Sequence, residues 1–150
     1  MSSQQYNLSL KNGKAMIDGK LVTTNIYVKD ETINLISEKN FESDETIDCK
    51  NLLILPGVID SQVHFREPGL EGKENLESGM LAAVSGGVTA IFEMPNTSPL
   101  TITPETIADK LDRARKGAWS DYAFYLGGTM RTSSNPVSYT HLTLPTICSV

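Results

Sequence analysis

The sequence is poor in cysteine, has no excess of positive charge and contains no long apolar run. Its two cysteines, Cys49 and Cys148, have neither the spacing of a zinc knuckle nor the number that a disulfide framework needs. We therefore expect free, buried thiols and a reducing, cytoplasmic location. Thirteen Lys and Arg against eighteen Asp and Glu leave a formal charge of -5, with no basic cluster, which argues against a nucleic-acid partner.

Signals for secretion or membrane insertion are also missing. The first residues lack a basic region followed by an apolar stretch, and the best apolar run, 52–59, contains Pro56 and Gly57. A spanning helix needs about 20 apolar residues, so we expect no membrane association. The 150 residues are 39% hydrophobic and 21% charged, which is the composition of a packed soluble domain.

Residues 1–55 read as a small β unit. The dipeptides Asn12-Gly13 and Asp18-Gly19 favour two-residue hairpin turns, because such turns need positive φ angles. We predict antiparallel pairing, as part of a β-sandwich subdomain that precedes the rest of the chain. The expected strands cover residues 6–10, 15–17, 21–28, 32–36 and 46–48.

From residue 52 onward the pattern becomes that of a parallel α/β unit. The segment 52–63 is apolar almost throughout, as in a strand buried on both faces. Two amphipathic helices follow; Gly86-Gly87 ends the first, and Thr103, as N-cap before Pro104, begins the second. With further strands expected at 88–94 and 121–126, strands recur at the interval of about thirty residues typical of βαβ repeats.

The number of βα repeats is too small for a closed barrel, whose eight units take about 250 residues. We therefore predict that residues 56–135 are the first units of an incomplete (β/α)8 TIM barrel. Residues 132–150 contain no charged side chain and eight Ser or Thr. Because the peptide 137–146 resembles translated sequencing adapter, we expect 136–150 to be a non-native tail.

Candidate functional side chains gather where the first barrel strand ends. Gln62 and His64 are two residues apart, so on a strand they would project from the same face. The carboxyl ends of the strands are where α/β barrels keep their active sites. A lone histidine is more often a packed or surface residue than a metal ligand, so His64 alone does not decide the function.

The flanking sequence resembles a known family. Pro56-Gly57-Val58-Ile59-Asp60 followed by His64 is similar to the first-strand motif of the amidohydrolase superfamily of metal-dependent barrels. The runs 65–69 and 93–97 resemble the type I branch of the dihydroorotase family in particular, and the resemblance extends over about residues 6–128. Allantoinases tend to carry Asn in place of Arg66, and hydantoinases lack the Arg-Glu-Pro-Gly run.

The resemblance implies a reaction and a set of site residues. The implied reaction is the reversible, zinc-dependent hydrolysis of dihydroorotate to N-carbamoyl-L-aspartate in pyrimidine biosynthesis, with one or two Zn²⁺ in the full-length parent. His64 would bind metal, and Arg66 and Asn96 would hold the substrate carboxylate. A surface ion pair for Arg66 and a turn role for Asn96 are the alternatives. The other family ligands and the general base have no counterpart here, so we expect no catalytic residue and no activity in this chain.

Gln62 departs from the family pattern, because it stands where the family has its first metal-binding histidine. A carboxamide oxygen is a poorer zinc donor than imidazole, so the metal site should be weakened. Two explanations stay open: an enzyme with a reduced ligand set, or a non-catalytic homologue that is a structural partner of aspartate transcarbamoylase. We favour the enzyme because Arg66 and Asn96 are both present. Allantoinase or hydantoinase activity is a further alternative, and we expect the full-length protein to be a homo-oligomer.

Overall fold

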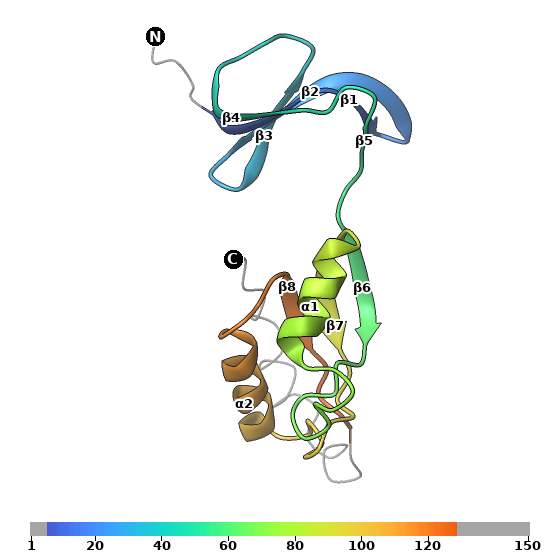
Figure 1. Ribbon diagram of the computed structural model, residues 1–150, viewed down its shortest axis with the longest axis vertical. Helices are drawn as coiled ribbons and strands as arrows, with labels where there is room; N and C mark the ends of the chain where they lie inside the picture. The colour runs from blue at the N-terminus through green and yellow to red at the C-terminus, as the bar shows by residue number, and fades with distance from the viewer. Residues whose placement is uncertain (1–5, 129–150) are drawn as a thin grey trace. The chain divides into compact units, whose positions relative to one another are not determined.

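The computed structural model describes residues 6–128, and the chain divides into two compact units, Met1–Pro56 and Gly57–Val150 (Figure 1). The predicted non-native tail at 136–150 and Cys148 lie outside the described residues. Within the described range, every helix is too short or too polar to cross a bilayer.

The first unit is a five-stranded sheet with the order β3-β2-β1-β4, in which β5 also pairs with β1. The Asp18-Gly19 hairpin between β1 and β2 is confirmed, with φ angles of 47° and 74°. The expectation of purely antiparallel pairing is wrong, because β4 and β5 both run parallel to β1. The chain crosses the sheet after β3 to reach the far edge of β1, which a tight hairpin could not do. The strands are β1 (Tyr6–Ile17), β2 (Lys20–Lys29), β3 (Thr32–Ser37), β4 (Ser43–Asp48) and β5 (Leu53–Ile54).

The expected hairpin at Asn12-Gly13 is instead a β-bulge inside β1. Asn12 has a φ of 64°, and the pairing with β2 shifts register between Leu10 and Gly13. The Asn12 N–H donates to Oδ1 of Asn25 at 2.9 Å, so a side chain satisfies the donor that the bulge removes from the ladder. The left-handed conformation of Asn12 therefore interrupts the pairing here without reversing the strand.

Aromatic rings fill the core of the first unit. Tyr6 and Tyr27 are buried, and their ring centroids lie 5.0 Å apart. Phe41 meets Tyr27 edge to face at 5.4 Å. Cys49 is buried and forms no disulfide with a described residue, as expected for a free thiol.

The second unit is a parallel sheet in the order β6-β7-β8 with two helices packed on it (Figure 1). The predicted alternation of strands and helices is confirmed, but residues 6–128 contain no closed barrel. The elements are β6 (Val58–Val63), α1 (Leu76–Ser85), β7 (Val88–Glu93), α2 (Pro104–Ala114) and β8 (Asp121–Phe124). Both helices and the sheet share one core, made of Leu76, Met80, Ile91, Ile107, Ala114, Tyr122 and Phe124.

The prediction of one continuous buried strand over 52–63 is wrong. The chain forms β5 and β6 as separate strands in different units, and the break contains Pro56, which has no N–H to give to a ladder. β6 is exposed from Val58 to Gln62, with Ile59 64% exposed and Val63 partly buried, and among the described residues only β7 pairs with it.

Local capping signals place the helices as the sequence predicts. Thr103 caps α2, and its hydroxyl and that of Thr106 exchange hydrogen bonds with each other's backbone N–H groups, with Pro104 in the first turn. Gly86 is the C-cap of α1, and Gly87 follows with a φ of 86°. The Thr103 cap marks the end of the loop after β7, and Gly86-Gly87 marks the end of α1.

Candidate functional site

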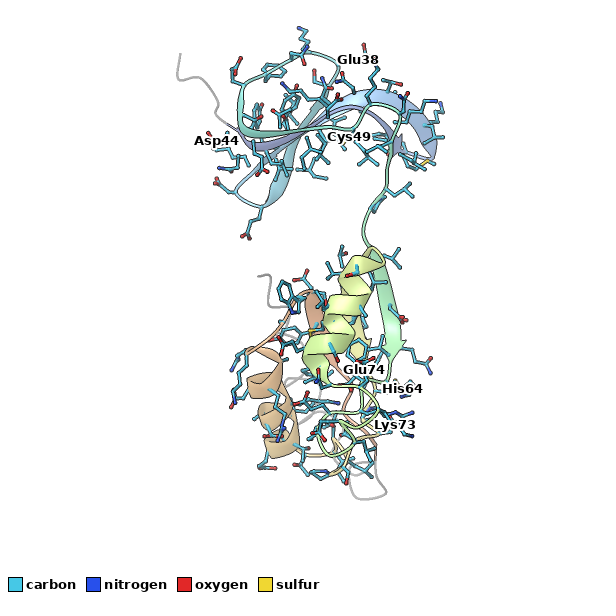
Figure 2. All side chains as sticks on the ribbon, viewed as in Figure 1. Glu38, Asp44, Cys49, His64, Lys73 and Glu74 are labelled. Carbon is cyan, nitrogen blue, oxygen red and sulfur yellow. The ribbon has the colours of Figure 1, made fainter. Side chains whose placement is uncertain are left out.

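The carboxyl ends of β6 and β7 bring His64 and Asn96 together. His64 follows β6 directly and lies where the β6 arrow ends in Figure 2. Its Nδ1 is 2.9 Å from Oδ1 of Asn96. Because a carboxamide oxygen only accepts hydrogen bonds, this contact requires a proton on Nδ1, and in the neutral imidazole Nε2 is then the nitrogen with a lone pair. Asn96 therefore holds His64 in the tautomer that can bind a metal through Nε2.

Asn96 keeps its amide nitrogen for another partner. The side chain is exposed, and its one hydrogen bond within residues 6–128 uses the oxygen. The two amide N–H groups remain able to donate to a bound anion. The sequence placed Asn96 in the site but did not predict its contact with His64.

Arg66 carries a positive charge that no described carboxylate pairs with. It lies between β6 and α1 with a φ of 71°, which is unfavourable for a residue with a side chain. The side chain is half-buried, and the ion pairs found among residues 6–128 involve other cations. The alternative of a surface ion pair is therefore not seen in the described part of the chain, and the guanidinium is available to an anionic ligand.

The loops that follow β6 and β7 are clasped to each other. The N–H of Ser98 donates to the carbonyl of Pro68 at 2.9 Å, and the N–H of Met94 donates to the carbonyl of Val63 at 3.0 Å. Gly69 has a φ of 88°, and a Cβ at this position would collide with the carbonyl group of Ser98. The segments that carry Arg66 and Asn96 therefore form one connected structure.

A buried ion pair lies beneath this clasp. Nζ of Lys110 is 2.7 Å from Oε2 of Glu93, and the two side chains are 0% and 1% exposed. The same ammonium donates to the carbonyl of Met94 at 3.2 Å and sits 5.1 Å from the ring centroid of Phe124. Glu93 lies two residues after Ile91 on β7, so both side chains face the helices.

Burial dominates the electrostatics of this pair. Burial raises the pKa of Glu93 above its ordinary value, and the nearby Lys110 and the backbone N–H groups of Phe65 and Arg66 oppose that rise. Burial likewise lowers the pKa of Lys110, against the attraction of Glu93. Sequence analysis missed this pair, although a lysine within the apolar stripe of α2 was a signal that it would need a buried partner.

Glu67, next to Arg66, has a structural role. Its Oε2 accepts the N–H of Leu76 at 2.9 Å, and Asn75 caps the same end of α1. Its Oε1 lies 3.4 Å from Nη1 of Arg113. These contacts border a cavity of about 310 Å³ beside the start of α1.

The described residues supply only part of a zinc site. Gln62 is exposed on β6, and its backbone N–H donates to Oδ1 of Asp60 at 3.0 Å. Between residues 6 and 128, no three His, Cys, Asp or Glu side chains are grouped so that they could hold a metal. Structural and catalytic zinc sites take at least three protein ligands. One imidazole with a weak carboxamide donor does not meet that requirement, so this part of the chain alone does not hold zinc.

Comparisons with known proteins identify relatives of the chain. A family model described as "Dihydro-orotase-like" matches residues 51–136. The dihydroorotase of Thermococcus kodakarensis is 38% identical over 125 residues, covering 82% of this chain and 31% of that protein. The dihydroorotase of Bacillus thuringiensis is 39% identical over 135 residues, covering 88% and 31%. The chain thus spans about a third of the length of these relatives.

Several solved structures with the same fold are hydantoinases. The L-hydantoinase (dihydropyrimidinase) from Arthrobacter aurescens matches with a TM-score of 0.85 at 25% identity, over 97% of this chain and 36% of that one. The D-hydantoinase (dihydropyrimidinase) from a Thermus species matches with a TM-score of 0.71 at 26% identity, over 89% and 31%. The predicted fold class is confirmed: the chain is mixed α/β and matches the region of these structures that includes their N-terminal β-sandwich.

Proposed function

Because this chain belongs to the dihydroorotase-like family of cyclic amidohydrolases, we propose that it forms the carboxylate-binding part of an enzyme that hydrolyses dihydroorotate. The observation that carries the proposal is Arg66. Its guanidinium has no ion-pair partner among residues 6–128, and its loop is clasped to the loop of Asn96.

The substrate class follows from the charge of the site. Dihydroorotate and N-carbamoyl-L-aspartate carry a carboxylate beside the reacting amide, whereas unsubstituted hydantoin and dihydrouracil carry none. A guanidinium binds a carboxylate through two parallel hydrogen bonds, each contributing roughly 1.5 to 3 kcal/mol. Arg66 therefore favours dihydroorotate, although the solved structures of similar fold are hydantoinases.

In the reaction we propose, water adds across the ring amide. The bond from the carbonyl carbon to the ring nitrogen breaks, a bond to the water oxygen forms, and the nitrogen takes up a proton. One or two Zn²⁺ in the whole protein would supply the Lewis acidity that activates water and polarises the carbonyl. Within this chain, His64 offers Nε2 as one metal ligand, Asn96 fixes the imidazole, and Arg66 orients the carboxylate.

Gln62 supports a second candidate function. A carboxamide in place of imidazole weakens metal binding. A non-catalytic homologue that binds aspartate transcarbamoylase would tolerate this loss. Both candidates are compatible with a cytoplasmic homo-oligomer acting in pyrimidine biosynthesis, which we propose for the whole protein.

The test is ring hydrolysis by the whole protein supplied with Zn²⁺, with dihydroorotate, hydantoin and dihydrouracil as substrates. We expect turnover of dihydroorotate and a loss of roughly 10- to 100-fold in kcat/KM for Arg66→Gln, the equivalent of one charge-assisted bond. Lys73→Gln removes an exposed cation from the segment between β6 and α1, which also contains Arg66. It is the matched control and should leave kcat/KM unchanged.

Two results would contradict the proposal. Unaltered dihydroorotate turnover in Arg66→Gln would remove the carboxylate role. A folded protein without turnover, with less than one zinc per chain and no gain from Gln62→His, would favour the non-catalytic function.

A further inference from the structure

The chain after β6 turns at Arg66, whose backbone has a positive φ of 71°. The backbone N–H groups of Phe65 and Arg66 favour the charged form of the buried Glu93 carboxylate, but neither of its oxygens accepts a hydrogen bond from a described residue. The Phe65 ring packs against Gly79 of α1, where a Cβ would collide with it. Glu93 thus lies at the point where the chain turns to present Arg66.

Lys110 reaches the other loop. Its ammonium pairs with Glu93 and also donates to the carbonyl of Met94, two residues before Asn96. The ion pair therefore holds the loop after β7 through the Lys110 ammonium, close to Asn96. Since both side chains are almost completely buried, water does not compete for these contacts.

We propose that Glu93 and Lys110 are positioning residues, which set Asn96 at the distance from Arg66 that one substrate carboxylate requires. The inference rests on the proposed function, because it gives the pair a role in binding that carboxylate. Stability alone is a weak reason for such a pair, because well-packed apolar residues of similar volume are often equally stable or more so. A displacement of about 1 Å in a binding group is enough to reduce activity roughly 100-fold.

A positioning role and a purely structural role predict different binding. If the pair positions the carboxylate-binding side chains, its loss weakens only ligands that carry the carboxylate bound by Arg66 and Asn96. If the pair only stabilises the core, its loss weakens every ligand in proportion to the unfolded fraction. N-carbamoyl-L-aspartate and N-carbamoyl-β-alanine form a matched pair of probes, because they differ only in that carboxylate.

The experiment measures the dissociation constants of both probes by calorimetry on the whole, zinc-loaded protein. The variants are Glu93→Gln/Lys110→Met, which keeps the volume of both side chains, Arg66→Gln, and the core control Ile107→Val on α2. We expect the double variant to weaken N-carbamoyl-L-aspartate binding about tenfold or more, with N-carbamoyl-β-alanine changed by less than about twofold. Ile107→Val should leave both constants unchanged although it removes a methyl group from the core and lowers stability.

The outcomes separate the inference from the function on which it rests. If Arg66→Gln weakens N-carbamoyl-L-aspartate binding and the double variant does not, the positioning role is wrong. If Arg66→Gln also changes nothing, the proposed function itself fails. If the double variant does not fold, Glu93→Asp gives the same comparison, because it keeps the negative charge on a side chain that is one methylene shorter. Equal weakening of both probes by that variant would overturn the inference.

Discussion

Replacing Lys110 by Met should destabilise the protein far more than its single charge suggests. The variant leaves Glu93, 1% exposed, without its cation, and neither of its carboxylate oxygens has a hydrogen-bond donor among the described residues. Removing one partner of a buried ion pair costs about 3 to 5 kcal/mol, a large part of a total stability of about 5 to 15 kcal/mol. Adding Glu93→Gln removes the uncompensated charge and should recover most of that loss.

The loss should also depend on pH, in a direction that the burial of Glu93 fixes. Burial raises the pKa of Glu93 in the folded state above its ordinary value of 4.5, and the removal of Lys110 takes away the main group that opposes the rise. A carboxyl whose folded pKa is raised contributes most stability below 4.5, and this contribution is lost as the pH rises through the folded pKa. In the parent protein, protonation of Glu93 deprives Lys110 of its counter-charge. The stabilities of the two proteins should therefore converge in acid.

The assay is urea unfolding followed by circular dichroism near pH 7 and again near pH 4, on either side of the ordinary glutamate pKa. Lys116→Met, which removes an exposed cation just after α2, is the control and should change stability by less than about 0.5 kcal/mol. The reasoning is refuted if Lys110→Met costs no more than this control near pH 7, or if its cost is the same at both pH values.

Three further predictions concern the site. Gly69→Ala should cost more than about 1 kcal/mol and speed hydrogen exchange at the Ser98 amide, because a Cβ meets the Ser98 carbonyl at a positive φ; normal protection of that amide would contradict the clasp. Asn96→Ala should release the His64 ring from the Nδ1–H tautomer, which ¹⁵N shifts of the imidazole report directly; an unchanged spectrum would mean that Asn96 does not hold the ring. Gln62→His should raise the zinc affinity of the whole protein by about tenfold or more, measured by competition with a chelator, and equal affinities would show that position 62 does not face the metal.

Elements decided by neighbouring residues could be predicted from the sequence. The Asp18-Gly19 hairpin and the Thr103 cap depend on local backbone chemistry, and both are present. Asn12-Gly13 has equally strong turn chemistry, but Asn25 supplies a hydrogen bond that lets the strand continue. The difference between a turn and a bulge therefore depended on a residue thirteen positions away.

Some residues of the candidate site could be predicted from the sequence, and others could not. A motif in one short segment was enough to single out His64 and Arg66, and a second short run singled out Asn96. The Glu93–Lys110 pair could not be predicted in this way, because the role of each residue depends on a contact with the other, which is distant in the sequence. The exposed surface of β6 could not be predicted either, since burial depends on which strands and helices lie beside it.

The contact between Gly69 and Ser98 limits how this site can diversify. Because any side chain at position 69 meets the neighbouring loop, the two loops cannot accept insertions or new residues independently. Recombination between homologues with a crossover between these positions would join loops that were never selected together. New substrate preferences in this lineage should therefore be inherited as a block that runs from the end of β6 through the loop after β7, with the helix between them carried along.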